Sequence, residues 1–379
     1  MKPTKSLLFL LCLAFLVRLC FLYPQFSGDV KNHLAWGNGF LVSPIGFYDQ
    51  HFPGFNDPNY PPVAIFLFAF SNLFLTFSNN ILNFLNHNFA IFPSVLIPLF
   101  NSENMRMGFL KLPAIFADLG TGWLLYKIIR ARSGKFPLLL SSLYLFNPAV
   151  IYISSVWGQI ESLTIFFLIY SLYQAIYGGR KKFISIGLFI LAALVKQTAL
   201  WFLPFFLLFW LKEMKVREFI QGVFLGLATF ILAYLPFGLL PWTALKIYFS
   251  SLSGSSTVVA DAAWNFWSFF FRAGTPDSVS LGFLTLRQFS ILLLAAILLI
   301  LLVKLYRHFS MLLFYNYLFI WSLAIFFFQT RVHERHLAFS LVFLLLLPRL
   351  NLRLILLYFL LTGFHLGNLF SSLKLPFLK

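Results

Sequence analysis

The segment Arg331-Val332-His333-Glu334-Arg335-His336 places four possible cations around one carboxylate, between two long apolar runs. A run such as 311–328 is typical of a membrane helix, so the segment is expected at a membrane boundary. An ionisable group near hydrocarbon is costly, which makes it a functional candidate by default. Cations suit a phosphate group, and a carboxylate accepts hydrogen bonds from hydroxyls. The segment therefore predicts a site for a phosphate and a polar ligand at the bilayer surface.

The composition indicates the setting in which this segment works. The chain has 379 residues, of which 60% are hydrophobic and only 10% are charged, whereas a soluble domain carries roughly 25% charged residues. We therefore expect an all-α membrane protein, with residues 1–379 forming a single polytopic domain in the lipid bilayer. The net charge of +17 does not indicate nucleic-acid binding, because most Lys and Arg lie in short loops beside apolar runs. Both cysteines lie in the first apolar run, and no metal site is predicted.

The apolar runs predict eleven to thirteen transmembrane helices. Several runs are shorter than the ~20 residues of a simple span, which suits tilted, broken or re-entrant helices. The pair 61–78 and 81–100 predicts either two spans or two helices along the interface. With the N-terminus inside, the basic segments Lys2/Lys5, 130–135, 180–182, 212–217, 304–307 and 349–353 are cytoplasmic. We expect a multi-pass protein of the plasma (inner) membrane, with outer loops that include 24–60, 238–287 and 329–336.

With this orientation, most of the unusual polar residues lie on the outer (periplasmic or extracytoplasmic) face. Substrate sites combine an aromatic, apolar lining with a few convergent polar groups. Aromatic rings beside amides and carboxylates suit a sugar, and the cations suit its phosphate. The set outside the segment 331–336 comprises Asp29, Tyr60, Trp157, Gln159, Glu161, Lys196, Gln197, Trp264 and Asn265. Together these residues predict a site for a lipid-linked sugar phosphate.

Six short motifs, in matching order over residues 1–340, resemble the GT-C superfamily of polytopic glycosyltransferases. They are Asp57-Pro-Asn-Tyr60-Pro-Pro62, Phe146-Asn-Pro148, Trp157-Gly-Gln159, Lys196-Gln197, Ala262-Ala-Trp264-Asn265-Phe266-Trp267 and Val332-His-Glu-Arg335. Family members place an acidic residue in a large first outer loop, as Asp29 does here. Two departures concern the sugar and the acceptor: no Asp-X-Asp is present, and Glu161 stands where an Asp is frequent.

The resemblance implies a GT-C-type fold and a hexosyltransferase. Such an enzyme would move mannose or glucose from a polyprenyl-phosphate donor, without a further cofactor, to a glycan, glycolipid or protein acceptor. Asp29 would be the general base of an inverting displacement. The donor phosphate would be bound by Lys196, Arg331, His333, Arg335 and His336. Sugar and acceptor would be bound by Tyr60, Trp157, Gln159, Glu161, Gln197, Trp264, Asn265 and Glu334.

Each assignment has a structural alternative. Asp29 also suits a helix cap, Tyr60 precedes two prolines that can begin a helix, and Trp157 suits the membrane interface. Asp118, deep in an apolar run, is expected to pair with a polar group such as Arg18, in a structural role. At the level of function, a transporter or flippase of lipid-linked sugars is one alternative. A protein O-mannosyltransferase-like enzyme is the other, although the first loop lacks an Asp-Glu pair.

Overall fold

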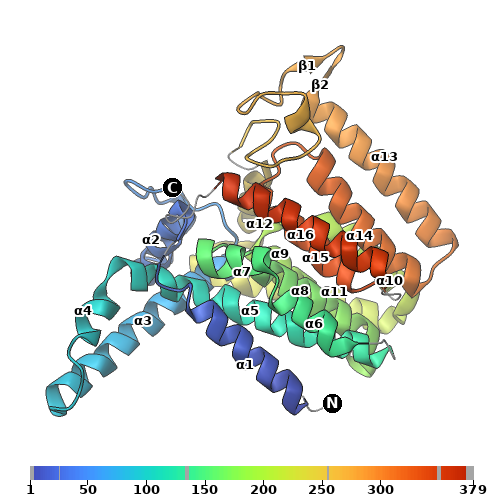
Figure 1. The fold of residues 1–379 in the computed structure, drawn as a ribbon. Coiled ribbons are helices and arrows are strands. Elements are labelled where there is room, and N and C mark those ends of the chain that lie inside the picture. Colours follow the sequence, from blue (N-terminus) through green and yellow to red (C-terminus); the bar gives the residue numbers. More distant parts are fainter. Residues whose placement is uncertain (1–3, 25, 133–135, 254–255, 348–350, 373–379) are drawn as a thin grey trace.

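The computed structural model describes residues 4–24, 26–132, 136–253, 256–347 and 351–372, and nearly all of its regular structure is helical (Figure 1). Lys2, Lys135 and Arg349, predicted to be cytoplasmic, lie outside these ranges. The α-helices are α1 (Lys5–Leu19), α2 (Gly28–Val42), α3 (Pro62–Asn88), α4 (Leu96–Asn101), α5 (Glu103–Ala131), α6 (Pro137–Leu145), α7 (Pro148–Ile151), α8 (Glu161–Tyr177), α9 (Ile184–Val195), α10 (Leu203–Glu213), α11 (Val216–Tyr234), α12 (Pro241–Ser250), α13 (Leu286–Arg307), α14 (Met311–Phe328), α15 (Ala338–Leu345) and α16 (Leu352–Ser372).

Shorter elements connect these helices. One of these elements is π-helical, η2 (Tyr152–Trp157). The others are 3₁₀-helical: η1 (Phe47–Asp49), η3 (Gly179–Lys181), η4 (Gln197–Phe202), η5 (Leu235–Phe237), η6 (Ser251–Ser253), η7 (Trp267–Phe269) and η8 (Glu334–Leu337). A two-stranded antiparallel hairpin pairs β1 (Ser280–Leu281) with β2 (Leu284–Thr285). The hairpin leads directly into the first turn of α13.

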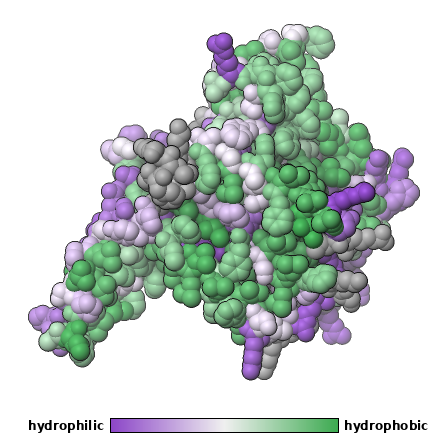
Figure 2. All heavy atoms as spheres, viewed as in Figure 1, coloured by the Kyte–Doolittle hydropathy of each residue, from purple (hydrophilic) through white to green (hydrophobic). Residues whose placement is uncertain are grey.

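The long helices identify an all-α membrane protein. Within hydrocarbon a helix satisfies all its backbone groups internally, so apolar runs of this length fold as helices there. Among the described residues, six helices are long and apolar enough to cross a membrane: α3, α5, Val216–Phe237, α13, α14 and α16. The pair Pro137–Leu145 and Pro148–Trp157, bent by 43°, makes a seventh if it is counted as one span. Apolar side chains cover much of the face seen in Figure 2, over the body of the bundle.

The expected eleven to thirteen spans are not reached by this measure, because several apolar runs form short helices. The runs near 6–23, 160–178, 183–195, 198–211 and 336–348 become α1, α8, α9, α10 and α15, with 15, 17, 12, 11 and 8 residues. The pair 61–78 and 81–100 does not form two spans. It is one 27-residue helix, α3, followed by the six-residue α4. In Figure 1, α3 points away from the body of the bundle.

The apolar run 136–153 is broken between α6 and α7. Asn147 caps α7 through its side-chain oxygen, which accepts from the amides of Ala149 (2.9 Å) and Val150 (3.3 Å), and Pro148 begins the helix. The wide π-helical turn η2 then ends at Gly158, whose φ is +80°. A Cβ at Gly158 would lie 2.7 Å from the Val30 side chain, so glycine is required here. The break thereby brings the segment after η2 against α2.

A buried ion pair joins α1 to α5, as the sequence predicted. The Nε of Arg18 lies 3.3 Å from Oδ2 of Asp118, and neither side chain is exposed to solvent. Tyr144 donates to the other carboxylate oxygen at 3.0 Å, and Arg18 also donates to the carbonyl of Leu145 at 2.8 Å. These partners offset the cost of two charges in an apolar core, so the pair has a structural role.

Candidate functional site

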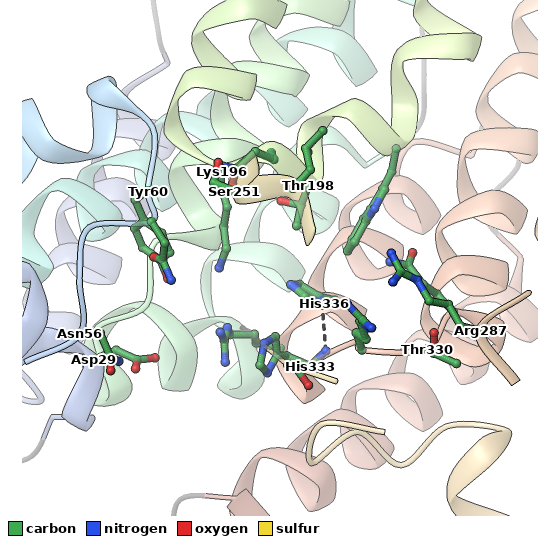
Figure 3. Close-up of a pocket in the computed structure, with 18 of the residues that line it drawn as sticks. Asp29, Asn56, Tyr60, Lys196, Thr198, Ser251, Arg287, Thr330, His333 and His336 are labelled. Atoms are coloured by element: carbon green, nitrogen blue, oxygen red, sulfur yellow. Dashed lines mark hydrogen bonds between the residues drawn. The ribbon is translucent and has the colours of Figure 1, made fainter. Parts of the chain in front are cut away.

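A cavity of about 560 Å³ opens where the loops at one end of the bundle meet (Figure 3). Its walls come from α2, the loop before α3, η4, η6, the start of α13 and the segment 329–336. Segments far apart in the chain thus share one space. Of the predicted site residues, eight line it: Asp29, Tyr60, Lys196, Gln197, Arg331, His333, Arg335 and His336.

Asp29 is held in place by the segment that follows η2. It is the second residue of α2, and the N-cap position belongs to Ser27. Gln159 donates through Nε2 to Oδ2 of Asp29 at 2.7 Å and to the hydroxyl of Ser27 at 3.3 Å. The amide of Ser27 in turn donates to the carbonyl of Trp157 at 3.0 Å. Gln159 is fully buried and outside the cavity lining, and its side chain orients Asp29.

Glu161 lies behind two of the cations and pairs with both. Its Oε1 accepts from Nζ of Lys196, and from Nε of Arg335 at 2.9 Å. Glu161 is the first residue of α8, where the helix dipole favours a negative charge, and it is completely buried. Arg335 also lies 3.2 Å from Oε1 of Glu334, and the acidic neighbours raise its pKa. Glu161 therefore holds the two cations in position and does not itself line the cavity.

His336 is a neutral hydrogen-bond donor at the centre of the cavity. Burial, followed by the charges of Lys196 and Arg335, holds the pKa of His336 well below its ordinary value. Its Nδ1 accepts from the backbone amide of His333 at 3.1 Å, the dashed line in Figure 3, so Nε2 carries the proton. That Nε2 is buried, with Glu161 4.0 Å away and no hydrogen-bond partner among the described residues. An anionic ligand would provide the missing acceptor.

Arg331 fastens one loop to another. Its guanidinium binds both carboxylate oxygens of Asp277, at 2.6 and 3.0 Å, and its backbone amide donates to the carbonyl of Val259 at 3.3 Å. The pair raises the pKa of Arg331 through the hydrogen bond to Asp277. His333 adds a second link, with Nδ1 3.6 Å from Asp261. Arg331 therefore stabilises the loop that forms this wall of the cavity. Its positive charge is largely balanced by Asp277 before any phosphate binds.

The remaining predicted residues are near the cavity or beyond it. The ring of Trp157 packs against Arg335, whose guanidinium carbon lies 5.8 Å from the ring centroid. Glu334 is buried, which raises its pKa despite the opposing charge of Arg335. Asn265 is buried and caps the turn at η7 through the amides at 267 and 268. Trp264 lines a separate cavity of about 500 Å³ and does not reach the first one.

Sequence reasoning missed several lining residues. Arg287, at the start of α13, reaches the cavity on the side away from Asp29 in Figure 3. Five more come from α2, which carries Asp29, and from the loop before α3: Asn32, His33, Trp36, Asn56 and Asn59. The clustering of four Asn in the loop 24–60, of which three line the cavity, was the available signal. The described part of the chain contains no group of three His, Cys, Asp or Glu side chains suited to a metal ion.

The arrangement combines a fixed carboxylate, two buried cations and a buried N–H donor in one space. Such a space suits a ligand with an anionic group at one end and a hydroxyl at the other. Comparison with protein-family models finds no match, and no curated protein is similar enough to count as a relative.

Proposed function

We propose that the chain is a glycosyltransferase that moves a hexose, mannose or glucose, from a polyprenyl-phosphate donor to an acceptor on the outer face of the plasma membrane. The observation that carries the proposal is the shared cavity. Asp29, Lys196, Arg335 and His336, whose Nε2 carries the proton, all line it, and in Figure 3 Asp29 lies at one end and His336 toward the middle. A membrane-embedded chain with such a cavity suits a lipid-linked phosphate. The GT-C resemblance of the sequence motifs points to the same reaction.

The reaction is a single displacement at the anomeric carbon. The acceptor oxygen forms a bond to this carbon while the bond from the carbon to the phosphate oxygen breaks. The acceptor proton passes to Asp29, which Gln159 orients through its 2.7 Å hydrogen bond. The bonding electron pair leaves with the phosphate oxygen, where negative charge grows. Lys196, Arg335 and His336 would stabilise that charge, the usual role of preorganised donors in a site that excludes water.

Asp29→Asn tests the proposal, because it keeps the shape and removes the base. Membranes with the wild-type chain are supplied with radiolabelled polyprenyl-phosphate mannose or glucose and native lipid extract. We expect label in a new product with the wild type and a loss of roughly 10²–10⁴ in rate with Asp29→Asn. Asp49→Asn is the matched control, since Asp49 is exposed in the same loop and does not line the cavity.

Two outcomes would contradict the proposal. If Asp29→Asn turned over near the wild-type rate, Asp29 would not be the general base. If neither donor lost its label and labelled lipid crossed the bilayer equally in both samples, the flippase alternative would replace the enzyme.

A further inference from the structure

The end of the cavity around Asp29 has a chemistry of its own. Six residues form it besides Asp29: Asn32, His33 and Trp36 from α2, and Asn56, Asn59 and Tyr60 from the loop before α3. Burial lowers the pKa of His33 to about 3, so its ring is uncharged near neutral pH. This end therefore contains one carboxylate, three amides and aromatic faces, with no cation among these lining residues. It suits an uncharged polar group and disfavours a phosphate.

We infer that the acceptor is a carbohydrate and that one of its sugar rings occupies this end of the cavity. The inference rests on the proposed function, in which Asp29 takes the proton of the acceptor. The group beside Asp29 must therefore carry the attacking hydroxyl. Each Asn amide can both donate and accept, as adjacent sugar hydroxyls require. Half-buried Tyr60 offers a flat face on which the C–H side of a ring can pack, and Trp36, which is 3% exposed, packs edge-on against Tyr60.

The wall of this subsite is already assembled without a ligand. Trp36 donates through Nε1 to the carbonyl of Asn56 at 2.7 Å, and the amide of Asn56 donates to Oδ1 of Asn32 at 3.1 Å. The hydroxyl of Tyr48 donates to the carbonyl of Tyr60 at 3.0 Å. The first two bonds tie the loop to α2 and the third ties it to η1, so little further ordering is required when the acceptor binds.

Tyr60 separates the two halves of the site. Its ring centroid is 5.5 Å from that of Trp36, and Nζ of Lys196 lies 5.3 Å from the same centroid. In Figure 3, Tyr60 lies between the Asp29 end and Lys196. An acceptor ring on the Asp29 side and a donor phosphate on the Lys196 side would thus meet at Tyr60, where the transferred sugar must lie.

A protein acceptor fits this end less well. An extended peptide is commonly bound by adding a strand to an exposed sheet edge. Within the described ranges the named strands are β1 and β2, and neither contributes a residue to this cavity. The walls beside Asp29 present side-chain amides and rings instead. A Ser/Thr peptide is therefore the alternative that the experiment must compare.

The experiment measures how much of the donor sugar is transferred to an acceptor and how much is released by hydrolysis. Purified full-length chain receives labelled polyprenyl-phosphate hexose together with methyl mannoside, methyl glucoside or a Ser/Thr peptide. We expect transfer to a sugar and not to the peptide. Asn59→Ala and Asn56→Ala should each lower the ratio of transfer to hydrolysis about three- to ten-fold, through loss of one hydrogen bond. Both side chains are exposed, so these variants should fold, and exposed Asn80 on α3 provides the control Asn80→Ala.

The possible outcomes test the carbohydrate acceptor and the glycosyltransferase activity separately. Donor cleavage with transfer to the peptide alone, or an unchanged ratio in both variants, would overturn the carbohydrate acceptor and leave the glycosyltransferase. A wild-type chain that cleaves the donor neither by transfer nor by hydrolysis would overturn both.

Discussion

Removing the charge of Glu161 should leave Lys196 without the carboxylate it pairs with, and Arg335 with Glu334 as its remaining acidic partner. The side chains of Lys196 and Arg335 are each 9% exposed, and both contact Oε1 of Glu161, with Arg335 at 2.9 Å. At an effective dielectric constant of about 20, a charge pair at this distance attracts by roughly 6 kcal/mol. Desolvation cancels much of that attraction. Breaking a buried pair typically costs about 3–5 kcal/mol, which we expect for Glu161→Gln.

Thermal unfolding in detergent measures the effect. With an unfolding entropy of about 2.1 cal/mol/K per residue, a loss of 3–5 kcal/mol lowers the midpoint of this chain by about 4–6 °C. Glu213→Gln, at an exposed carboxylate that ends α10, is the control and should leave the midpoint unchanged.

A second measurement addresses the role of the cations in binding. Polyprenyl phosphate would supply the anion that Glu161→Gln lacks, so it should raise the midpoint of this variant more than that of the wild type. A Glu161→Gln chain as stable as the wild type, or equal stabilisation of the two by the lipid, would refute the reasoning.

Three further predictions concern other charged groups. Arg18→Leu should lower the free energy of unfolding by about 3–5 kcal/mol, and Arg18→Leu with Asp118→Leu should recover most of that loss in denaturation experiments, because the double variant leaves no unpaired buried charge. Burial lowers the pKa of His33 to about 3, so its contribution to stability is complete above pH ~6.5 and falls by about 1.4 kcal/mol per pH unit from there toward pH 3. His33→Phe should flatten thermal stability against pH in this window, and an unchanged slope would contradict the assignment. Arg331→Met leaves the carboxylate of Asp277, 3% exposed, without its guanidinium and should cost about 2 kcal/mol, since Arg331 itself is partly solvated. Limited proteolysis within 256–285 should accelerate, whereas a residue that only bound phosphate would leave the proteolysis rate unchanged.

The helical class and the grouping of polar residues could be read from the sequence, because both follow from local patterns. Apolar runs mark helices, and rare charged residues at their ends mark one face of the bundle. The pairing of Asp118 with a polar group followed from the cost of an isolated buried carboxylate, and Arg18 confirms it. The number of spans could not be read, because a short helix buried among neighbours and a full span have similar composition.

The roles of individual charges depend on tertiary contacts that no local pattern contains. Glu161, Lys196 and Arg335 are distant in sequence and meet only after α8, α9 and η8 pack together. The sequence therefore indicated that the cations and the carboxylate belong to one site. It did not indicate that Glu161 stands behind the cations, or that Arg331 is engaged by Asp277.

The π-helical turn η2 has a consequence for how this chain tolerates changes in length. Each residue of an α-helix advances the next by about 100° around the axis, and a π-helical turn accommodates one residue more than an α-helical turn. Deleting a single residue between Asn147 and Gly158 would let η2 rewind as an α-helical turn and would nearly keep the direction of the chain that follows, whereas deleting two residues would rotate that chain by about 100°. Gln159 would then leave Asp29, although both residues would still be present. The orientation of the carboxylate is thus encoded in a residue count as well as in residue identities.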